Sequence, residues 1–571
     1  MTDILDITWL LPVFLYAETH YRFRYFWSYL RKKEPEIIAD APHRIEPGND
    51  IPLLMLVKDA HQYPCSLLQV TISGSQNGRT LFQKKLLTRP VTIKKRWWWT
   101  VSHIPTRGML GWVTLDVQFE IESGNGRRIY HNDNYRSSSQ KPLEIFVPDS
   151  PLPKLPGLHL GDVHVHSSYT NDQVEYGAPL EPSVTLSKAI GLSFFCVTDH
   201  SYDLDDEVSD YLRNDLLLPK WKALLQEVAF INRSNRKHKI IFGEEVSCRN
   251  SRGENVHFLL YGKNKFVPGS GDSAERWLRN RSEYSARDVL AERGTGKAVA
   301  AHPQEHVPLL QKLLLGRGAW TRADLQLAGL TGTQFLNGQL GDGFERGKKE
   351  WVRLLLSGIR ILALAGNDAH GNFNRFRQIG IPFLRIAEHD RQIFGRMRTG
   401  LFLESSPSEK SIFSALQKGN VIISDGPVAT FSAVNDLGAT AVLGESIVGG
   451  MLSLHVTALS SDEFGAIRSV RIYCGLIGRN REELIYLEKN VGSLHFDRSM
   501  RFKFLQAGYL RMEVITSPQT SFDKKPHFSL TNPVWFTCGS EPKKSPSEEG
   551  LKTIRILSRS SASGARDSKP F

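Results

Sequence analysis

Residues 161–170 read GDVHVHSSYT, and this stretch decides how the middle of the chain is interpreted. It contains a β-type run, DVHVH (162–166), in which His164 and His166 alternate with valines. Alternate side chains of an extended strand point to the same face. The pattern therefore predicts a strand that presents two imidazoles on one side.

Further strand-like segments follow, and amphipathic stretches such as PKWKALLQEVAFINR separate several of them. The segments are SFFCVT (193–198), KIIFGEEVS (239–247), NVHFLLYG (255–262), KAVAAH (297–302) and RILALAG (360–366). Strands that alternate with helices are typical of parallel β/α units. We therefore expect an α/β domain over residues 157–400, built as a closed or nearly closed β/α barrel.

Histidines and carboxylates occur at or just after the C-terminal ends of most of these strands. They are His164, His166, His200, Glu245, His302, Asp368 and His370, with His257 inside the NVHFLLYG segment. Strand ends of a β/α barrel meet on one face, and imidazole and carboxylate groups together suit Zn, Mn or Fe. A single histidine is usually a core or surface residue, and an Asp after a strand can cap a helix. Burying so many of these groups together without a metal would be costly, which favours a metal site.

In order and spacing, GDVHVHSSYT, VTDHS, FGEEVS, NVHFLLYG, AAHP and GNDAHG resemble the motifs of the PHP (polymerase and histidinol phosphatase) domain family, over residues 157–375. The resemblance implies a distorted seven-stranded β/α barrel with two or three divalent metal ions (Zn, Mn or Fe). The ligands that it implies are His164, His166, Asp172, His200, Glu245, His257, His302, Asp368 and His370, with Glu245 bridging two metals. Asn171 stands where family members commonly have an acidic residue or a histidine, a departure that bears on the third metal position.

This ligand set predicts a metal-dependent hydrolase, with a phosphate ester of a small molecule or nucleotide as the leading substrate. Two metals about 3.5–4 Å apart acidify a shared water and neutralise phosphate oxygens. Glu245 is expected to be catalytic as the bridge, and His200 or His370 to protonate the leaving oxygen. Arg375 and Arg377 follow the last ligand and are predicted to hold an anionic group of the substrate, with a solvated helix start as the alternative.

Three other functions stay open at this point. A 5′–3′ exonuclease on DNA or RNA would use the same metals. A carboxylate or carbamate ester hydrolase is suggested because KGNVIISDGPVATFSAV resembles the extension of long family members with that activity. In the third alternative the chain is a non-catalytic scaffold that the metals stabilise.

Short β-type runs on both sides of the predicted barrel indicate two β-sandwiches. The first is expected over residues 41–150, with runs such as LLMLV and WVTLDVQFEI, and the second over residues 410–538, with MLSLHVTAL and GYLRMEVIT. Residues 1–40 are predicted to be helical. Residues 539–571 are rich in Ser, Lys and Pro and are predicted to be disordered. A chain of 571 residues is expected to form several domains.

The net charge of +12 favours anionic partners, namely a phosphorylated substrate or, as an alternative, nucleic acid. The five cysteines contain no CxxC pair, which indicates neither a disulfide framework nor a thiolate zinc site and favours a cytoplasmic location. The apolar run of residues 9–17 is short and contains Pro12, so no integral membrane segment is expected. The sequence does not define an oligomeric state.

Overall fold

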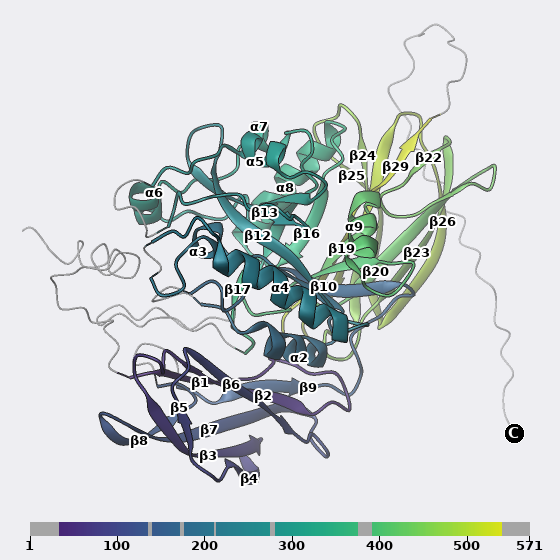
Figure 1. The fold of residues 1–571 in the computed structure, drawn as a ribbon. Helices are drawn as coiled ribbons and strands as arrows, with labels where there is room; N and C mark the ends of the chain where they lie inside the picture. Colours follow the sequence, from purple (N-terminus) through teal and green to yellow (C-terminus); the bar gives the residue numbers. More distant parts are fainter. Residues whose placement is uncertain are drawn as a thin grey trace, which may run out of the picture.

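The computed structural model describes residues 34–134, 140–171, 176–210, 213–273, 280–374 and 391–538. Strands dominate these residues, and Figure 1 shows them gathered in three regions that follow the order of the chain. Three of the predicted site residues, Asp172, Arg375 and Arg377, lie outside this part of the chain, as does the segment 539–571. No helix among the described residues is both long and apolar enough to cross a membrane.

The N-terminal region consists of two antiparallel sheets that share one hydrophobic core. The smaller sheet contains β1 (Glu36–Asp40), β2 (Ile51–Lys58) and β6 (Trp97–Ile104). The larger contains β3 (Cys65–Gln76), β4 (Arg79–Leu87), β5 (Val91–Ile93), β7 (Gly111–Ser123), β8 (Gly126–His131) and β9 (Leu143–Val147). Residues 1–40 were expected to be helical, and for Glu36–Asp40 this is wrong, because this apolar run pairs with β2 as a buried strand.

The central region is a curled, mixed sheet of strands and helices. Its strands are β10 (Leu158–His166), β11 (Phe194–Val197), β12 (Lys239–Arg249), β13 (Asn255–Tyr261), β14 (Lys297–Ala301), β15 (Gly332–Asn337) and β16 (Leu362–Gly366), in that spatial order. Its helices are α2 (Leu180–Ile190), α3 (Ser201–Leu204), α4 (Pro219–Ser234), α5 (Ala286–Glu292), α6 (Leu309–Leu315), α7 (Arg322–Leu325) and α8 (Asp342–Leu356).

The expectation of parallel β/α units is correct for part of this sheet only. The pairs β10–β11, β11–β12, β14–β15 and β15–β16 are parallel, but β13 is antiparallel to both of its neighbours. The loop 250–254 between β12 and β13 is too short for the crossover that a parallel connection needs, so the chain turns back as a hairpin. The described residues form a half-barrel rather than a clear β/α barrel.

The curl of the sheet brings its two ends close to each other. The short strand β17 (Ala369–His370) follows β16 and pairs with the end of β10, placing His370 opposite His166. The buried carboxylate of Asp162 on β10 accepts hydrogen bonds from Asn367 and from the backbone N–H of Gly395. These contacts hold the segment after β16 against β10.

The C-terminal region continues the same sheet. On its other edge β10 pairs with β18 (Arg398–Phe402), and the ladder runs on through β19 (Val421–Ser424), β28 (Phe528–Thr531), β27 (Gly508–Thr516), β24 (Ile467–Leu476) and β25 (Glu483–Ser493). β22 (Ser446–Val448) and β29 (Val534–Thr537) attach beside β27. A separate antiparallel sheet contains β20 (Val428–Asn435), β21 (Thr440–Ala441), β23 (Met451–Leu459) and β26 (His495–Lys503), and its buried residues share a core with β24 and β27.

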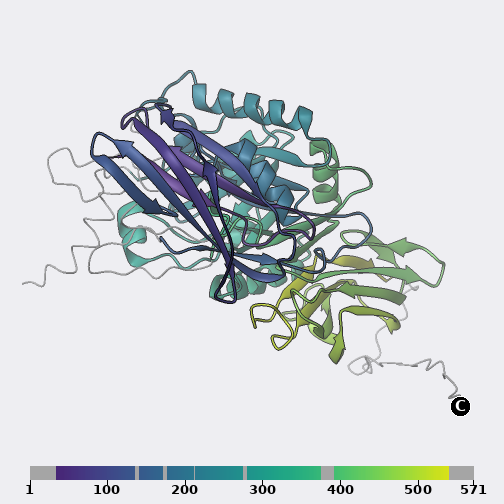
Figure 2. The ribbon, with the colours of Figure 1, turned by 90° about the horizontal axis from the view of Figure 1, so that it is seen from below.

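Two helices show how the local sequence sets the element ends. Helix α9 (Glu409–Lys418) begins with a capping box between Ser408 and Ser411, and ends at Gly419, whose φ of 82° is left-handed. Helix α2 likewise ends at a left-handed glycine, Gly191. In Figure 1, α2 lies between the N-terminal sheets and the central sheet, and Figure 2 shows the N-terminal and C-terminal strands on different sides of the central region.

Candidate metal centre

His164 and His166 occupy alternate positions of β10, and both side chains are buried. Their rings lie on the same side of the strand, with centroids 5.3 Å apart, whereas Val163 and Val165 pack into hydrophobic cores. The alternation of the sequence therefore produces the paired imidazoles directly.

Glu245 on β12 lies at the centre of a group of five histidines. Its Oε2 atom is 3.3 Å from Nε2 of His164, 3.2 Å from Nε2 of His166 and 3.2 Å from Nδ1 of His200. Its Oε1 atom is 2.6 Å from Nδ1 of His257 and 3.2 Å from Nε2 of His302. Glu245 is 1% exposed, so this carboxylate faces imidazoles rather than water.

Asp368 and His370 complete the group from the segment after β16. Oδ1 of Asp368 lies 3.1 Å from Nε2 of His166, and the ring of His370 stacks on that of His166 at 3.9 Å between centroids. Asp368 has a φ of 52° and His302 a φ of 28°, in the left-handed region that such residues seldom adopt. Strained backbone of this kind is concentrated at functional sites.

The side chains form three overlapping groups of ligand atoms, and the atoms of each group lie within 4.8 Å of one another. The groups are His166, His200 and His370; His164, His166, Glu245 and Asp368; and Glu245, His257 and His302. His166 belongs to the first two groups and Glu245 to the last two. The arrangement is that of a possible site for more than one metal ion with shared ligands.

The chemistry of these donors fits divalent metal ions. Nδ1 of His200 and Oε2 of Glu245 are buried and 3.2 Å apart, yet neither has a hydrogen-bond partner of acceptable geometry. Leaving such atoms unsatisfied is costly. The buried carboxylate of Glu245 and the partly buried one of Asp368, among imidazoles, would be satisfied by cations that accept nitrogen and oxygen ligands together.

Without a metal, the protons of this group are distributed unevenly. Burial alone would lower the pKa of His166, but the neighbouring carboxylates of Asp368 and Glu245 raise it to about 10. Burial and the charge of His166 together lower the pKa of His200 to about 3 and that of His370 to about 4. The pKa of Glu245, which burial would raise, is held well below its usual range by His257 and His164. The carboxylates are thus ionised and attract positive charge, which bound metals would supply.

A second layer of side chains orients the histidines. Gln334 Oε1 lies 3.1 Å from Nδ1 of His164, and Thr170 Oγ1 lies 3.2 Å from Nδ1 of His166. Asp272 Oδ2 lies 2.6 Å from Nε2 of His257. Each contact holds the ring nitrogen that points away from the cluster, so the other nitrogen faces the potential metal position.

Asp272 and Gln334 were missed in the sequence. Asp272 lies in a Gly- and Ser-rich loop after β13, and Gln334 lies on β15, which was not predicted as a strand. Neither position carries a local signal, because the residues that they contact are distant in the chain. Asp199, next to His200, accepts hydrogen bonds from Ser167 and from the backbone N–H of Thr170, and so holds the loop after β10.

The structure brings together His164, His166, His200, Glu245, His257, His302, Asp368 and His370. Asp172, Arg375 and Arg377 lie outside the described residues, so their roles stay predictions. The catalytic roles of His200, Glu245 and His370 also stay predictions, because proximity alone does not define a reaction.

No protein-family model and no curated protein matches the chain. Similar solved structures include β-glucuronidase 2 of Bacteroides uniformis, with 8% identity, 88% of this chain and 61% of that chain covered, and a TM-score of 0.16. They also include trypsin-activated α-2-macroglobulin of Escherichia coli, with 9% identity, 89% of this chain and 24% of that chain covered, and a TM-score of 0.14. A Paenibacillus cycloisomaltooligosaccharide glucanotransferase has 11% identity and a TM-score of 0.15, with 87% of this chain and 71% of that chain covered. The chain thus spans about three fifths of the glucuronidase, and such TM-scores carry no argument about its fold or function.

Proposed function

We propose that the chain is a metal-dependent phosphoesterase whose central region is a distorted seven-stranded barrel of the PHP type, flanked by two β-sandwiches. The observation that carries the proposal is the position of Glu245, a buried carboxylate within reach of five imidazoles and common to two of the three ligand groups. The order of the motifs along the chain, described above, is the second support.

The side chains named above would hold two or three ions. When bound, such ions supply Lewis acidity, which acidifies water and neutralises the charge of a substrate phosphate. Glu245 would set the spacing of the ions, and Asp272 and Gln334 would keep the rings of His257 and His164 in their ligand orientation. The low pKa of His200 and His370 favours a neutral imidazole, which suits a ligand better than a proton donor.

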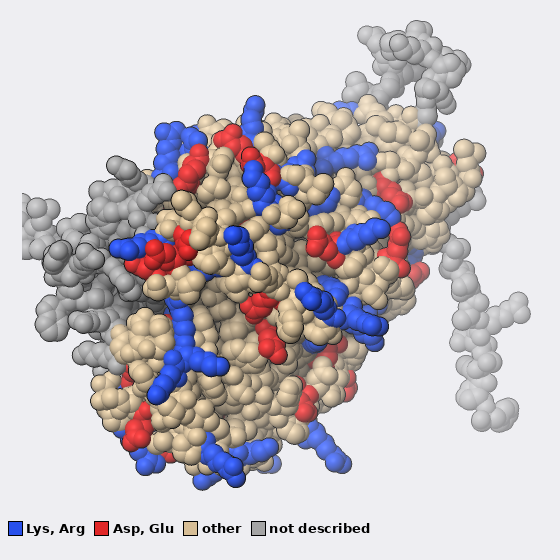
Figure 3. Space-filling view, viewed as in Figure 1, with Lys and Arg blue, Asp and Glu red and all other residues tan. Residues whose placement is uncertain are grey.

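The observations do not favour an exonuclease over a small-molecule phosphoesterase. On the face in Figure 3, Lys and Arg side chains are interspersed with Asp and Glu, and no continuous basic track crosses it. An extended polyanion would be held best by such a track. The ester-hydrolase alternative shares the same centre and differs only in the substrate.

The decisive experiment combines metal analysis with a substrate panel. Wild-type protein, reconstituted with Zn or Mn, should hold two or three metal equivalents and should hydrolyse aryl phosphate mono- or diesters. The Glu245→Gln variant is the matched control for chemistry. Less than one equivalent of metal in the wild type would overturn the site.

The panel also separates the alternatives. Turnover of oligonucleotides from the 5′ end, with a steep fall in binding as salt rises, would favour the exonuclease. Turnover of aryl carboxylates or carbamates alone would favour the ester hydrolase. Full metal content without turnover of any substrate class would favour the alternative of a non-catalytic scaffold that the metals stabilise.

A further inference from the structure

A cavity of about 310 Å³ lies at the ends of β14, β15 and β16 that are opposite to the metal centre. Lys297 begins β14 and Thr331 directly precedes β15, whereas His302 and Asp368 follow the other ends of β14 and β16. A strand of this length spans roughly 15 Å, so the cavity and the metal centre are separate sites. Trp535 of β29 and the C-terminal end of α9, including Gln417 and Lys418, form its other wall.

Positive charge gathers around this cavity, and three of its four cations have no ion-pair partner among the described residues. Arg293, Lys297, Arg360 and Lys418 line it, and no Asp or Glu is among the lining residues. Lys418 pairs with Glu404, at 2.6 Å. Among the described residues, no carboxylate forms an ion pair with any of the other three cations.

Contacts with uncharged groups hold two of these cations in place. The guanidinium of Arg360 lies over the ring of Trp535, 4.9 Å from its centroid, and donates a hydrogen bond to Ser446 Oγ at 2.8 Å. Nζ of Lys297 donates to Oε1 of Gln417 at 2.6 Å. Burial and the nearby charge of Arg293 lower the pKa of Lys297. Arg360 and Lys297 are therefore held beside the cavity, and the repulsion between Lys297 and Arg293 is an electrostatic cost that a bound anion would remove.

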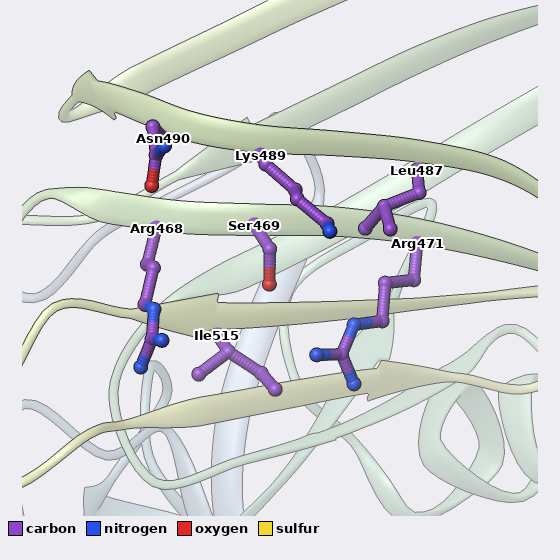
Figure 4. Close-up of a pocket in the computed structure, with 7 residues that line it drawn as sticks. All are labelled: Arg468, Ser469, Arg471, Leu487, Lys489, Asn490 and Ile515. Carbon is purple, nitrogen blue, oxygen red and sulfur yellow. The ribbon is translucent and has the colours of Figure 1, made fainter.

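A hollow of about 250 Å³ on the outer face of β24, β25 and β27 offers a comparison. Arg468, Arg471 and Lys489 lie around Ile515 there (Figure 4). Arg471 is paired in register with Glu513 and helps to lower the pKa of that carboxyl. One of its cations therefore already has a counter-charge, unlike Arg293, Lys297 and Arg360.

We propose that the cavity between β14–β16 and Trp535 binds a compact polyphosphate anion of the size and charge of pyrophosphate. Three unpaired cations around a small volume match an anion with several charged oxygens, and the Arg guanidinium can contact two phosphate oxygens at once. A nucleic acid would need a longer basic surface than a cavity of this volume provides. The inference goes beyond the proposed hydrolysis and does not rest on it.

The test is calorimetric titration of the metal-loaded protein with inorganic pyrophosphate. The wild type should bind saturably, and Arg293→Gln/Arg360→Gln should weaken binding at least about tenfold, or ~1.4 kcal/mol. The matched control is Arg236→Gln/Lys237→Gln, which removes two exposed charges just after α4. It should change the dissociation constant less than about twofold, or ~0.4 kcal/mol.

Folding of each variant is checked by its melting temperature. If the double variant melts early, Lys297→Met decides instead, and it should weaken binding at least about threefold, or ~0.7 kcal/mol. Equal binding by wild type and pocket variants would place the pyrophosphate elsewhere, at the metal centre for example, and overturn the proposal. Absence of saturable binding to the wild type would do so too. If an oligonucleotide binds through these residues and pyrophosphate does not bind, the proposal of a small anion is wrong and the cavity binds nucleic acid instead.

Discussion

Nε2 of His257 lies 2.6 Å from Oδ2 of Asp272, on the side of the ring opposite to Glu245. This carboxylate therefore fixes the orientation of the ring, and Arg317 in turn donates to it at 2.7 Å. Carboxylate–histidine pairs of this kind raise the basicity of a metal ligand.

Replacing this carboxylate should weaken metal binding without removing a ligand. In Asp272→Asn, we expect the metal affinity to fall about 10- to 100-fold, because the amide supports the imidazole less well. Competition with a chelator measures the affinity. Asp342→Asn, at the exposed start of α8, is the control and should leave it unchanged. If Asp272→Asn and the wild type bind the metal with equal affinity, Asp272 does not support His257 as a metal ligand.

The two neighbouring glutamates of β12 should behave differently. Glu245→Gln should lower kcat by at least about a thousandfold, or ~4 kcal/mol, because the carboxylate proposed to bridge the ions would lose its charge. Glu244 points away from the cluster, and burial raises its pKa to about 8. At neutral pH an amide resembles its protonated form, so Glu244→Gln should keep kcat within about threefold, or ~0.7 kcal/mol. Similar kcat values in the two variants, at wild-type metal content, would exclude Glu245 from the mechanism.

The stability of the protein should depend on the protonation of His527. Burial would lower its pKa, but Asp425 and Asp523 raise it to about 9. The stabilisation is complete below the ordinary pKa of an unfolded histidine, about 6.5, and is lost as the pH rises through about 9. Each unit of pKa shift corresponds to about 1.4 kcal/mol.

Urea unfolding of wild type and His527→Gln, from about pH 6 to about pH 9.5, covers the unfolded pKa of roughly 6.5 and the folded pKa of about 9 and so tests this dependence. The stability difference between the two proteins should shrink toward the alkaline end. His455→Gln, which replaces an exposed histidine on β23, is the control for the loss of a histidine side chain. A constant difference for His527→Gln would show that its charge does not stabilise the fold.

The cysteines should react with thiol reagents at very different rates. Cys65, Cys196, Cys248 and Cys474 are buried free thiols, and Cys538 is partly exposed. Burial raises the pKa of Cys196 and Cys248 well above the usual range. In native protein we expect Cys538 to react first, and in unreduced, denatured protein all five thiols to react. Mass spectrometry of the labelled protein reads out both states, and a disulfide would contradict the prediction.

Much of the sheet could be predicted from the sequence, because its strands are apolar runs with strong local patterns. The runs in residues 193–198, 239–247 and 297–302 form β11, β12 and β14 as expected. Strand β15 was missed because Thr333 and Gln334 make it look polar. Gln334 is buried there, with hydrogen bonds toward His164 and Asn337 that satisfy its amide. Polarity of this kind depends on partners distant in the chain and has no local signature.

The direction of β13 could not be obtained from the pattern of strands. Its run NVHFLLYG looks like any buried strand, and only the short loop 250–254 distinguishes a hairpin from a crossover. The histidine and carboxylate positions were easier to predict, because most of them lie at or just after the C-terminal ends of the predicted strands. Asp272 was not predictable in this way, since its loop follows no strand end at the cluster and its partner is His257.

The hydrogen-bond ladder from β10 through β18 and β19 to β28 has a consequence for anyone who recombines parts of this chain. Joining a different C-terminal region at residues 403–408 would remove β19, the strand that pairs with β18. The apolar β18 would then be an open sheet edge next to β10, the strand of His164 and His166. Such edges recruit other strands and promote aggregation. A chimeric protein should therefore keep residues 158–538 together as one segment, and any junction should be placed before β10.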